Sequence, residues 1–409
     1  MRRCKLGDIA ELTVGFVGNM TKEYAEYGIP FLRSLNIKPF MIDDSDLMYI
    51  TERFNTVLKK SALHTGDIVI VRTGIPGTCC VIPEEYDNTN CADMVIVRTN
   101  EVNPYFLAGY INFWGQKQIR SQKVGAVQKH FNVASAKEMI IYIPNDQEKI
   151  ATLLKSINDK IVLNNRVNAT LEAMAKTLYD YWFVQFDFPD EKGRPYKTSG
   201  GKMVYNEELG REIPAGWEVG NLNVIAEYIN GLACQRFRPQ ENEDSLPVVK
   251  IREIHEGIQA DTERVSANIP DSNIIYDGDI LFSWSATLEV HYWIGGKAGL
   301  NQHIFKVMPK DGFCKEYVYY QLREYVINFS KIAEARKTTM GHITQDHLDL
   351  SRIALPPRHV MSSFQKSIRP IHERMIRGAQ ENHRLATLRD WLLPMLMNGQ
   401  VGFKRESNE

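Results

Sequence analysis

Residues 145–184 read NDQEKIATLLKSINDKIVLNNRVNATLEAMAKTLYDYWFV, and this stretch decides the fold. Asn145 is followed three residues later by Glu148, a spacing that is typical of a helix start. Apolar side chains then recur mostly at intervals of three and four residues, which predicts one long helix with an apolar seam. The predicted seam residues are Ile150, Leu153, Ile157, Ile161, Val167, Leu171, Met174, Leu178 and Tyr181. A helix of about 35 to 40 residues would be roughly 50 to 60 Å long.

A second stretch later in the chain repeats this pattern, although Pro370 and Gly378 weaken it. Its seam residues are Phe364, Ile368, Ile371, Met375, Leu385, Leu388, Leu392 and Met395. We therefore expect the two helices to pair as an antiparallel coiled coil. Asn164 and Asn382 fall on the seams, where a buried amide can fix the register of the pair.

The helices belong to an internal duplication. LGDIAELTVG from Leu6 matches LNVIAEYING from Leu222, and IPFLRSLNI from Ile29 matches LPVVKIREI from Leu246. HTGDIVIVRT around Asp67 matches YDGDILFSWS around Asp279, and KHFNVASAKEMIIYIP matches GHITQDHLDLSRIALP. The matches keep one order along the chain, which indicates two copies of one structural unit.

Each copy reads as an α+β domain followed by a long helix. Runs rich in Val and Ile, such as IVIVRT from Ile68, MVIVRT from Met94 and DILFSW from Asp279, predict strands. Between the copies, residues 187–216 are rich in Gly, Pro and charged residues, which is typical of a linker and places the domain boundary there. The expected fold is therefore α+β, with two duplicated globular domains separated by a pair of long antiparallel coiled-coil helices.

Composition limits the class of protein. The chain has 409 residues and a net charge of -1, so a DNA-binding surface would have to be local rather than spread over the whole protein. The six cysteines form no C-x-x-C pair, so we expect free thiols rather than a zinc ribbon. The absence of an apolar run of about 18 residues predicts a cytoplasmic protein without a membrane span or signal peptide.

Three motifs carry a resemblance to a known family. They are EIPAGWEVGNL (212–222), LYDYWFVQFDFP (178–189) and LRDWLLPMLMNG (388–399). Over essentially the whole length, the chain resembles the specificity subunits of Type I restriction-modification systems. The first repeat departs from the pattern, because it begins at CKLGDIAEL without the Pro-x-Gly-Trp opening.

The resemblance implies a non-catalytic subunit with two target recognition domains, each reading half of a bipartite, asymmetric site in the major groove of double-stranded DNA. On this basis we expect domain 1 at 1–145, a central spacer helix at 146–188, a linker at 189–220, domain 2 at 221–357, a second spacer helix at 358–400 and a tail at 401–409. It also implies two methyltransferase subunits and up to two restriction subunits as partners. The adenine-N6 methylation and the cleavage, with S-adenosylmethionine, ATP and Mg²⁺, would belong to those partners.

Two alternatives stay open at this point: a specificity subunit of a methylation-only system, and a non-catalytic DNA-binding decoy. A self-sufficient nuclease or methyltransferase is disfavoured, because no phosphate-binding glycine loop or complete metal-binding motif is found. His372-Glu373 begins a zinc-protease pattern, but Ile376 stands where its second His is required. We therefore predict no catalytic, cofactor or metal site in this chain.

The candidate DNA contacts lie in a basic strip, residues 116–137, and in its counterpart in the second repeat. Lys and Arg there would neutralise phosphates, while His, Asn and Thr would reach phosphates or base edges. The first copy offers Lys117, Arg120, Lys123, Lys129, His130 and Asn132, and the second offers Arg336, Lys337, His342 and Thr344. Weaker candidates are Arg33, the aligned Lys250, and Arg252.

Aromatic and large apolar side chains gather at one end of each predicted helix, more than one seam can bury. Such clusters favour protein interfaces, although packing against the chain's own domains is equally open. The candidate partner-binding residues are Tyr179, Tyr181, Trp182, Phe183 and Phe186 on the first helix, and Trp391, Leu392, Leu393 and Met395 on the second.

Overall fold

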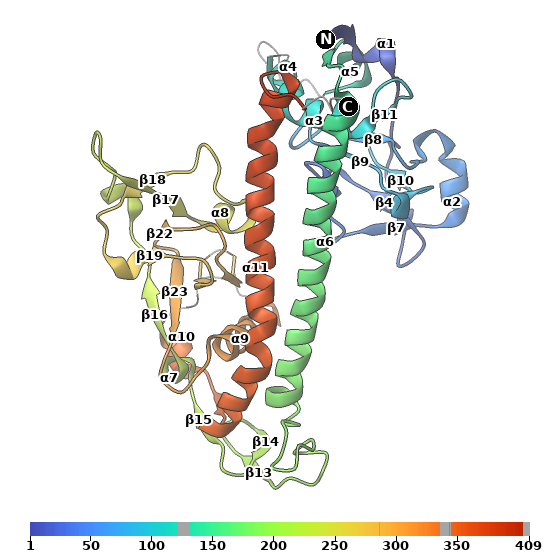
Figure 1. The fold of residues 1–409 in the computed structure, drawn as a ribbon. Coiled ribbons are helices and arrows are strands. Elements are labelled where there is room, and N and C mark those ends of the chain that lie inside the picture. Colours follow the sequence, from blue (N-terminus) through green and yellow to red (C-terminus); the bar gives the residue numbers. More distant parts are fainter. Residues whose placement is uncertain (122–130, 286, 336–342, 344, 404–409) are drawn as a thin grey trace, which may run out of the picture. The chain divides into compact units, whose positions relative to one another are not determined.

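The computed structural model describes residues 1–121, 131–285, 287–335, 343 and 345–403. The chain divides into two compact units: unit 1 is Met1–Leu163 together with the chain from Arg384 onwards, and unit 2 is Asn164–His383. Two long helices, α6 (Gln147–Tyr179) and α11 (Arg358–Met397), each contribute to both units. They are the green and red helices in Figure 1.

Besides a short pair of β5 (Ile37–Lys38) with β6 (Met41–Ile42), unit 1 contains two four-stranded sheets and a two-stranded ribbon. The first sheet has the order β2-β11-β8-β9, from β2 (Glu11–Val14), β8 (Ile68–Val71), β9 (Cys79–Val81) and β11 (Met94–Arg98). The second has the order β10-β4-β7-β3, from β3 (Tyr24–Ala25), β4 (Ile29–Leu32), β7 (Met48–Ile50) and β10 (Asn90–Cys91). The ribbon pairs β1 (Arg2–Lys5) with β12 (Ile140–Ile143).

Strand β8 shows why the sequence of unit 1 folds in this way. Successive side chains of a strand point to opposite faces, so Ile68 and Ile70 pack in one core and Val69 and Val71 in another. The first core also holds side chains of α3 (Pro104–Tyr110). A strand that is covered on both faces needs an unbroken apolar run, which is the pattern IVIV.

Unit 2 repeats the strand order of unit 1 in its main sheet, whereas the two second sheets differ in their edge strands. Its main sheet is β16-β23-β20-β21, from β16 (Ala226–Asn230), β20 (Ile280–Ser283), β21 (Glu289–Tyr292) and β23 (Ile304–Pro309). Its second sheet is β18-β17-β22-β19, from β17 (Ser245–Val249), β18 (Arg264–Ser266), β19 (Ile274–Ile275) and β22 (Ala298–Leu300). The ribbon pairs β15 (Glu218–Gly220) with β24 (Ile353–Leu355). The duplication predicted from the sequence is therefore confirmed in three dimensions.

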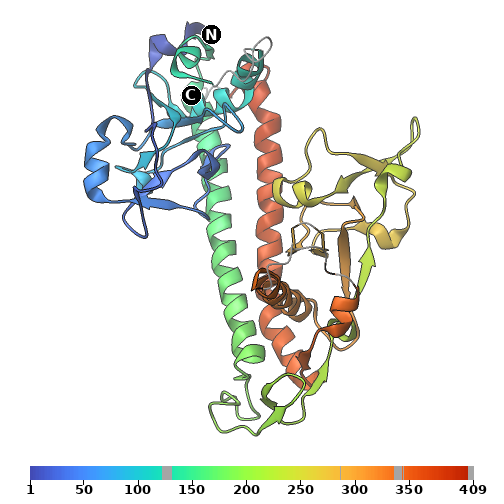
Figure 2. The same cartoon turned by 180° about the vertical axis from the view of Figure 1, so that it is seen from behind.

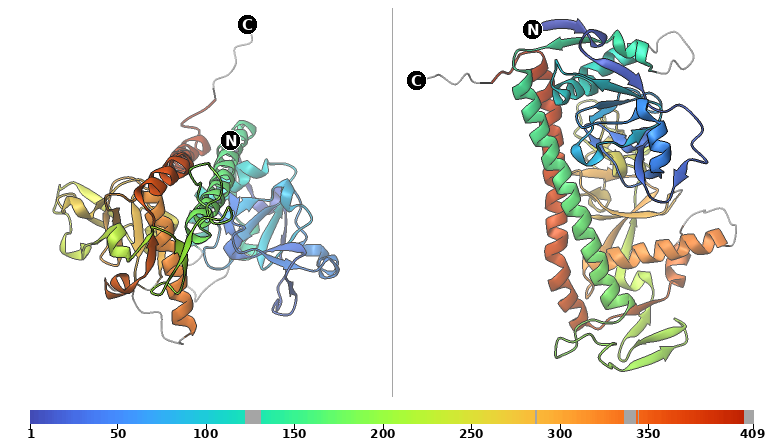
Figure 3. Two further views of the ribbon diagram at one scale, coloured as in Figure 1. Left: turned by 90° about the horizontal axis from the view of Figure 1, so that it is seen from below. Right: turned by 90° about the vertical axis from the view of Figure 1, so that its right-hand side faces the viewer.

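The helical segments also correspond. In unit 1, α4 (Gln116–Ser121) and α5 (Val133–Lys137) precede α6; in unit 2, α9 (Lys315–Ala335) and α10 (Gln345–Leu350) precede α11. Figure 2 shows both units from behind, and the second view of Figure 3 shows α9 along its length. Short helices complete the two units: α1 (Leu6–Ile9), α2 (Glu52–Val57), α7 (Leu222–Ile225) and α8 (Ile251–Glu256).

The Gly- and Pro-rich stretch between the repeats packs on unit 2 rather than standing free. It forms a hairpin of β13 (Met203–Asn206) and β14 (Arg211–Pro214). Phe188, Ile213 and Trp217 are buried in the same core as Tyr179 and Phe183. The division into compact units falls inside α6, between Leu163 and Asn164, so this stretch belongs to unit 2.

Within unit 1, the first part of α6 packs antiparallel against the last part of α11. Ile150, Ala151 and Leu154 share a core with Leu393, Leu396 and Met397. One heptad further along α6, Arg389 donates a hydrogen bond to the buried Asn158 side chain (3.1 Å). The helix pair predicted from the two seams is thus present in this unit.

Within unit 2, amide side chains hold the rest of α6 against α11. Asn164, which is 3% exposed, donates from Nδ2 to Asn382 Oδ1 and to Glu381 Oε2, both at 2.9 Å. Asn168 donates to the Met375 carbonyl oxygen (3.1 Å), beside Gly378. A Cβ atom at residue 378 would lie only 2.7 Å from Asn168 Oδ1. Gly378 therefore permits this close approach, and α11 continues unbroken through Gly378 and Pro370.

The buried face of α6 differs from the predicted seam in its second half. Met174 is 53% exposed, whereas Ala175, Tyr179 and Trp182 are buried. The predicted seam positions 174, 178 and 181 therefore lie one residue before the buried positions 175, 179 and 182. Apolar residues stand on both sides of the buried seam, so apolar spacing alone does not fix its register. On α11, Leu388 of the predicted seam is likewise exposed.

All six cysteines are free thiols, and five of them are buried: Cys79, Cys80, Cys91, Cys234 and Cys314. Burial raises the pKa of Cys80 and of Cys314 to about 12, so these thiols stay protonated at neutral pH. Among the described helices, none combines the length and the apolar character that crossing a bilayer requires.

Candidate nucleic-acid interface

The described part of the basic strip of unit 1 ends with α4 at Ser121 and resumes at Phe131, which is buried beside the sheet. Arg72, the residue that follows β8, donates from Nε to the Phe131 carbonyl oxygen (3.1 Å). Arg72 also forms an ion pair with Asp93. The guanidinium therefore anchors the returning end of the strip to the end of a central strand.

Unit 2 builds the same junction with different residues. Trp284 follows β20 as Arg72 follows β8, and its carbonyl oxygen accepts a hydrogen bond from the Ile343 amide (3.0 Å). Ile343 corresponds to Phe131 in the duplication, and it is also fully buried. In both units, the residue after the central strand thus bonds to the backbone of an equivalent buried residue, Phe131 or Ile343.

The structure places only part of the predicted strip. Lys117 lies with its Nζ atom 4.8 Å from the centre of the Trp114 ring, and the backbone of Arg120 lies in α4. Asn132 caps α5, because its Oδ1 accepts a hydrogen bond from the Ser135 amide (2.8 Å). The other predicted contacts lie outside the described residues: Lys123, Lys129 and His130 in the first copy, and Arg336, Lys337, His342 and Thr344 in the second.

Asn132 therefore has a local structural role as the cap of α5, whereas the sequence placed it among the DNA contacts. Its side-chain oxygen is occupied by α5, so Nδ2 is the group that stays available for an acceptor on DNA. The Lys117 ammonium group lies above the face of the Trp114 ring. The ring attracts this cation but does not neutralise its charge.

The three weaker candidates are already paired with carboxylates. Arg33 binds Asp46 (2.9 Å), Lys250 binds Glu263 (2.7 Å), and Arg252 binds both Glu253 (2.8 Å) and Asp261 (3.1 Å). Hydrogen bonds to Glu253 and then Asp261 raise the pKa of Arg252 further above its ordinary value. The charges of these cations are therefore already balanced in part by carboxylates of their own unit.

Arg33 and Lys250 nevertheless occupy equivalent places in the two units. Each stands directly before a short helical turn, and its backbone amide donates to the side chain three residues later, Asn36 or Glu253. The alignment made from the sequence was therefore correct, and it marks a shared turn.

Most of the predicted partner-binding aromatics are core residues. Tyr179, Trp182, Phe183 and Phe186 are between 2% and 5% exposed, and they pack with Trp217, Tyr317 and Phe364 of the same unit. Leu393 is buried in unit 1. For these five residues the prediction of a docking surface is wrong, because the chain's own domains cover the apolar area that one helix seam could not.

Four residues of that prediction keep some access to solvent. Trp391 is 62% exposed and Tyr181 is 38% exposed, while Leu392 and Met395 are half-buried. A large aromatic side chain exposed on a helix is a feature of binding surfaces rather than of cores. Trp391 is thus the best described candidate for a contact with another subunit.

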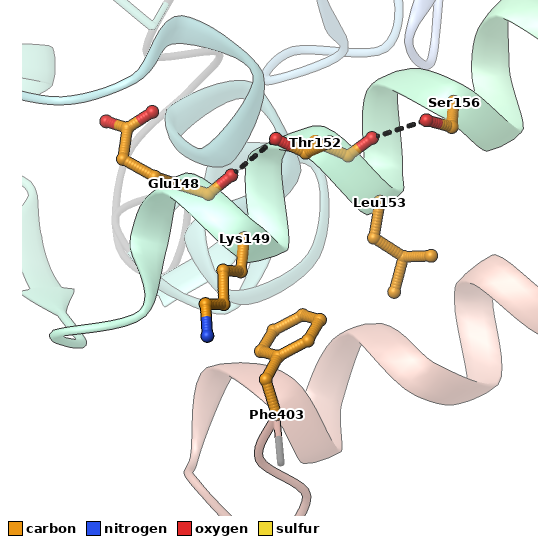
Figure 4. A pocket seen from close by; sticks show the side chains of 6 residues that line it. All are labelled: Glu148, Lys149, Thr152, Leu153, Ser156 and Phe403. Atoms are coloured by element: carbon orange, nitrogen blue, oxygen red, sulfur yellow. Dashed lines mark hydrogen bonds between the residues drawn. The ribbon is translucent and has the colours of Figure 1, made fainter. Parts of the chain in front are cut away.

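A shallow pocket of about 440 Å³ opens where α6 begins in unit 1 (Figure 4). Phe403, from the segment after α11, faces Leu153 across it, and Lys149 Nζ lies 5.9 Å from the Phe403 ring centre. Its few polar groups, Glu148, Thr152 and Ser156, bond mainly within the helix, so the pocket offers no convergent set of ligand-binding groups.

One group in unit 2 has the donor atoms to hold a metal ion: His255, Glu289 and His291. Neither this group nor Arg72 was found from the sequence. The pattern Glu-x-His at 289–291 on a strand was a usable signal, but its third member comes from a separate helix. Arg72 lies in the recognised run IVIVRT, and only the fold brings it to Phe131.

Comparisons with known proteins agree with this arrangement. A family model described as the Type I restriction modification DNA specificity domain matches the chain twice, at residues 2–173 and 214–385. The specificity subunit of the HindI enzyme from Haemophilus influenzae is 24% identical over 360 residues, covering 75% of this chain and 76% of that protein. The specificity subunit of the MjaIX enzyme from Methanocaldococcus jannaschii is 22% identical and covers 97% and 92%, respectively.

Among solved structures, the S subunit of a Type I restriction-modification system from M. genitalium superposes with a TM-score of 0.55. The sequences share 11% identity, and the alignment covers 96% of this chain and 94% of that one. This likeness concerns the fold, and it extends over both repeats.

Proposed function

The chain belongs to the family of Type I restriction-modification DNA specificity proteins, and from that premise we propose that its two domains read the two halves of one bipartite, asymmetric site on double-stranded DNA. As a specificity subunit it is the DNA-recognition component, with two target recognition domains. It supplies sequence recognition rather than catalysis.

The strand order that the two main sheets share supports the recognition of a two-part DNA site. Units 1 and 2 have the same main sheet, and in each the residue after the central strand bonds to an equivalent buried residue, Arg72 to Phe131 and Trp284 to Ile343. The two frameworks are alike, but the residues at the junction differ. Two similar recognition domains with different side chains suit a DNA ligand that presents two different sequences.

We assign the contacts with phosphate to the basic strip that includes Lys117, Arg120, Lys123 and Lys129, and to its counterpart with Arg336 and Lys337. His130, Asn132, His342 and Thr344 are the candidates for base edges. A local strip is required because the chain as a whole has a net charge of -1. Arg33, Lys250 and Arg252 would contribute only after exchanging their carboxylate partners for phosphate.

The rest of the assembly follows from the same premise. We infer that two methyltransferase subunits dock on this chain, that up to two restriction subunits join them, and that the complex acts in the cytoplasm. S-adenosylmethionine, ATP and Mg²⁺ would be bound by those partners. Trp391, with Tyr181, Leu392 and Met395, is the part of the predicted docking surface that the fold leaves accessible.

The proposal is tested by exchanging one domain. Residues 221–357 are replaced by the corresponding domain of a relative, and the methylated sequence is mapped across the genome of a host that carries the partner subunits. We expect one half of the methylated site to change and the other half to stay the same. The matched control exchanges residues 1–145 and should change the opposite half. An unaltered site after both exchanges would overturn the proposal.

A further inference from the structure

Three side chains of unit 2 converge between a short helix and an edge strand. Glu289 and His291 are two residues apart on β21, so both point to the same face of the sheet. On that face lies α8, whose Ile254 packs against the core that contains Leu281. His255, the next residue of α8, reaches Glu289 from there.

The distances bring both carboxylate oxygens into contact with imidazole nitrogens. His255 Nε2 lies 2.7 Å from Glu289 Oε1, and His291 Nε2 lies 2.9 Å from Glu289 Oε2. The ligand atoms of the three residues all fall within 4.8 Å of one another. Zinc–ligand bonds of about 2.0 to 2.2 Å in a tetrahedron place ligand atoms roughly 3.3 Å apart, so the three groups already have the spacing of a coordination shell.

A simple hydrogen-bonded triad explains only part of this geometry. The His255 ring makes a hydrogen bond to Glu289, whereas the buried His291 Nε2 atom lies 2.9 Å from Glu289 Oε2 without the geometry of a hydrogen bond. A buried polar nitrogen without a well-formed hydrogen bond is unfavourable. A cation shared by the nitrogens and the carboxylate would satisfy it.

We propose that His255, Glu289 and His291 bind a Zn²⁺ ion that links α8 to β21. Two imidazoles and one carboxylate are a ligand set that zinc accepts, with water in the fourth position. Mg²⁺ and Ca²⁺ prefer shells made of oxygen, so two nitrogen ligands select against them. Within the described residues, this is the one group of three such side chains close enough to share an ion.

The ion would act as a cross-link. Helix α8 has only six residues, and an isolated helix of that length is not stable in water. Its first turn carries Arg252 and follows Lys250, two of the candidate DNA contacts. A zinc ion at His255 would fix the C-terminal end of this helix to the sheet, and would thereby restrain the position of both cations.

The test measures zinc binding and does not depend on DNA recognition. The full chain is freed of metal with a chelator, titrated with ZnCl₂ by isothermal calorimetry, and assayed for bound metal after dialysis. We expect one equivalent of zinc for the wild type. Removal of an outer-shell partner typically costs 10- to 100-fold in affinity, so the loss of a direct ligand in His255→Asn or His291→Asn should cost at least about 100-fold. Millimolar Mg²⁺ should not compete.

The matched control is His64→Asn in unit 1. His64 faces a single carboxylate, Asp87, at 3.7 Å, so this variant should keep the zinc affinity of the wild type. Because His255 is half-exposed, its replacement should leave the circular dichroism spectrum of the metal-free chain unchanged, which separates a lost ligand from a lost fold. Zinc should also raise the melting temperature of the wild type but not of His255→Asn.

Two results would overturn the proposal. One is a wild-type chain that takes up no zinc. The other is uptake that is unaffected by His255→Asn and His291→Asn, which would place the ion elsewhere. Substitution with Co²⁺ distinguishes a site built on thiolates, because sulfur ligands give an intense charge-transfer band that a histidine and carboxylate site lacks. Either result would leave the assignment of the chain as a DNA-specificity subunit untouched.

Discussion

Single amide side chains set the register of the helix pair within unit 2. Asn164 bonds to Glu381 and Asn382, and Asn168 bonds to the Met375 carbonyl oxygen in the space that Gly378 leaves open. A buried amide that is satisfied only in one alignment disfavours the others, since sliding the helices would leave it without partners.

This arrangement predicts that Gly378→Ala lowers the free energy of unfolding, the opposite of its effect in an ordinary helix. In an ordinary helix interior the change would stabilise by up to about 1 kcal/mol. Here the new Cβ would meet Asn168 Oδ1 at 2.7 Å, so we expect the substitution to lower the free energy of unfolding by about 1 to 3 kcal/mol. Urea unfolding measures it. In an Asn168→Ala background the clash is gone, and Gly378→Ala should then stabilise; destabilisation in both backgrounds would refute the contact.

A second residue predicts how stability depends on pH. His372 is 2% exposed, and burial, followed by the Arg323 guanidinium, lowers the pKa of His372 from 6.5 to about 4. Its ring nitrogens make no hydrogen bonds, and Tyr292, Tyr319 and Tyr320 surround it. The folded chain thus takes up the proton less readily than the unfolded chain does.

Because the folded pKa lies below the unfolded one, this contribution is complete above pH 6.5 and is lost as the pH falls toward 4. The difference corresponds to about 3 kcal/mol. Urea unfolding at pH 7.5 and at pH 5 should show about 2 kcal/mol of this loss in the wild type. His372→Phe, which cannot be protonated, should show a smaller dependence; equal slopes in the two proteins would contradict the assignment.

At the scale of elements, the sequence was most informative where the pattern was regular. The strands β8, β11 and β20 were predicted from runs of Val and Ile, because a strand that is covered on both faces shows an unbroken apolar run. Both long helices were predicted from their spacing. The register of the second half of α6 was not, since Met174 and Tyr181 are apolar yet face outward while Ala175 and Trp182 face inward.

The candidate site could be predicted only as a segment. The charge pattern predicted the basic strip, and the duplication predicted its counterpart in the second repeat. Arg72, which bonds to Phe131 of the strip, lies 59 residues before Phe131 in the sequence, so no local pattern reveals it. The aromatic cluster of Tyr179 and Phe183 was assigned to partners because nothing local reveals that Trp217 and Tyr317 cover it. Contacts between distant segments decide both cases.

The basic strip predicts a salt-dependent loss of DNA affinity. Replacing Lys123 and Lys129 with Glu removes two phosphate contacts, so the slope of the logarithm of affinity against the logarithm of salt should fall by about 2. Fluorescence anisotropy with the cognate duplex measures it. Lys59→Glu with Lys60→Glu, an exposed pair in the same unit, changes the net charge equally and should have a smaller effect. Equal effects of the two pairs would indicate long-range charge alone.

At the scale of the whole molecule, both long helices pass from one compact unit into the other. Helix α6 crosses the division after Leu163 and α11 crosses it after His383. Inserting seven residues at both points preserves the heptad pattern, and the bonds of Asn158 with Arg389 and of Asn164 with Asn382 stay within their own units.

Seven residues add about 10.5 Å of helix, which matches roughly three base pairs at 3.4 Å each. We expect the two halves of the methylated site to stay the same and the gap between them to lengthen by about that number. Genome-wide methylation mapping reads the gap directly. An insertion into α6 alone breaks the pairing and should abolish methylation, which makes it the matched control. A gap that does not change after the double insertion would rule out the helices as the spacer.

The ribbon of β1 with β12 has a practical consequence for unit 1. Arg2 pairs with Ile143, just before α6, and Phe403 packs on Lys149, in the first turn of α6. The first described segment therefore pairs with the strand that leads into α6, and the last described segment lies on the first turn of that helix. A circular permutant, with these segments joined by a flexible peptide and new termini in the turn between β13 and β14, would present the second repeat before the first while keeping both cores.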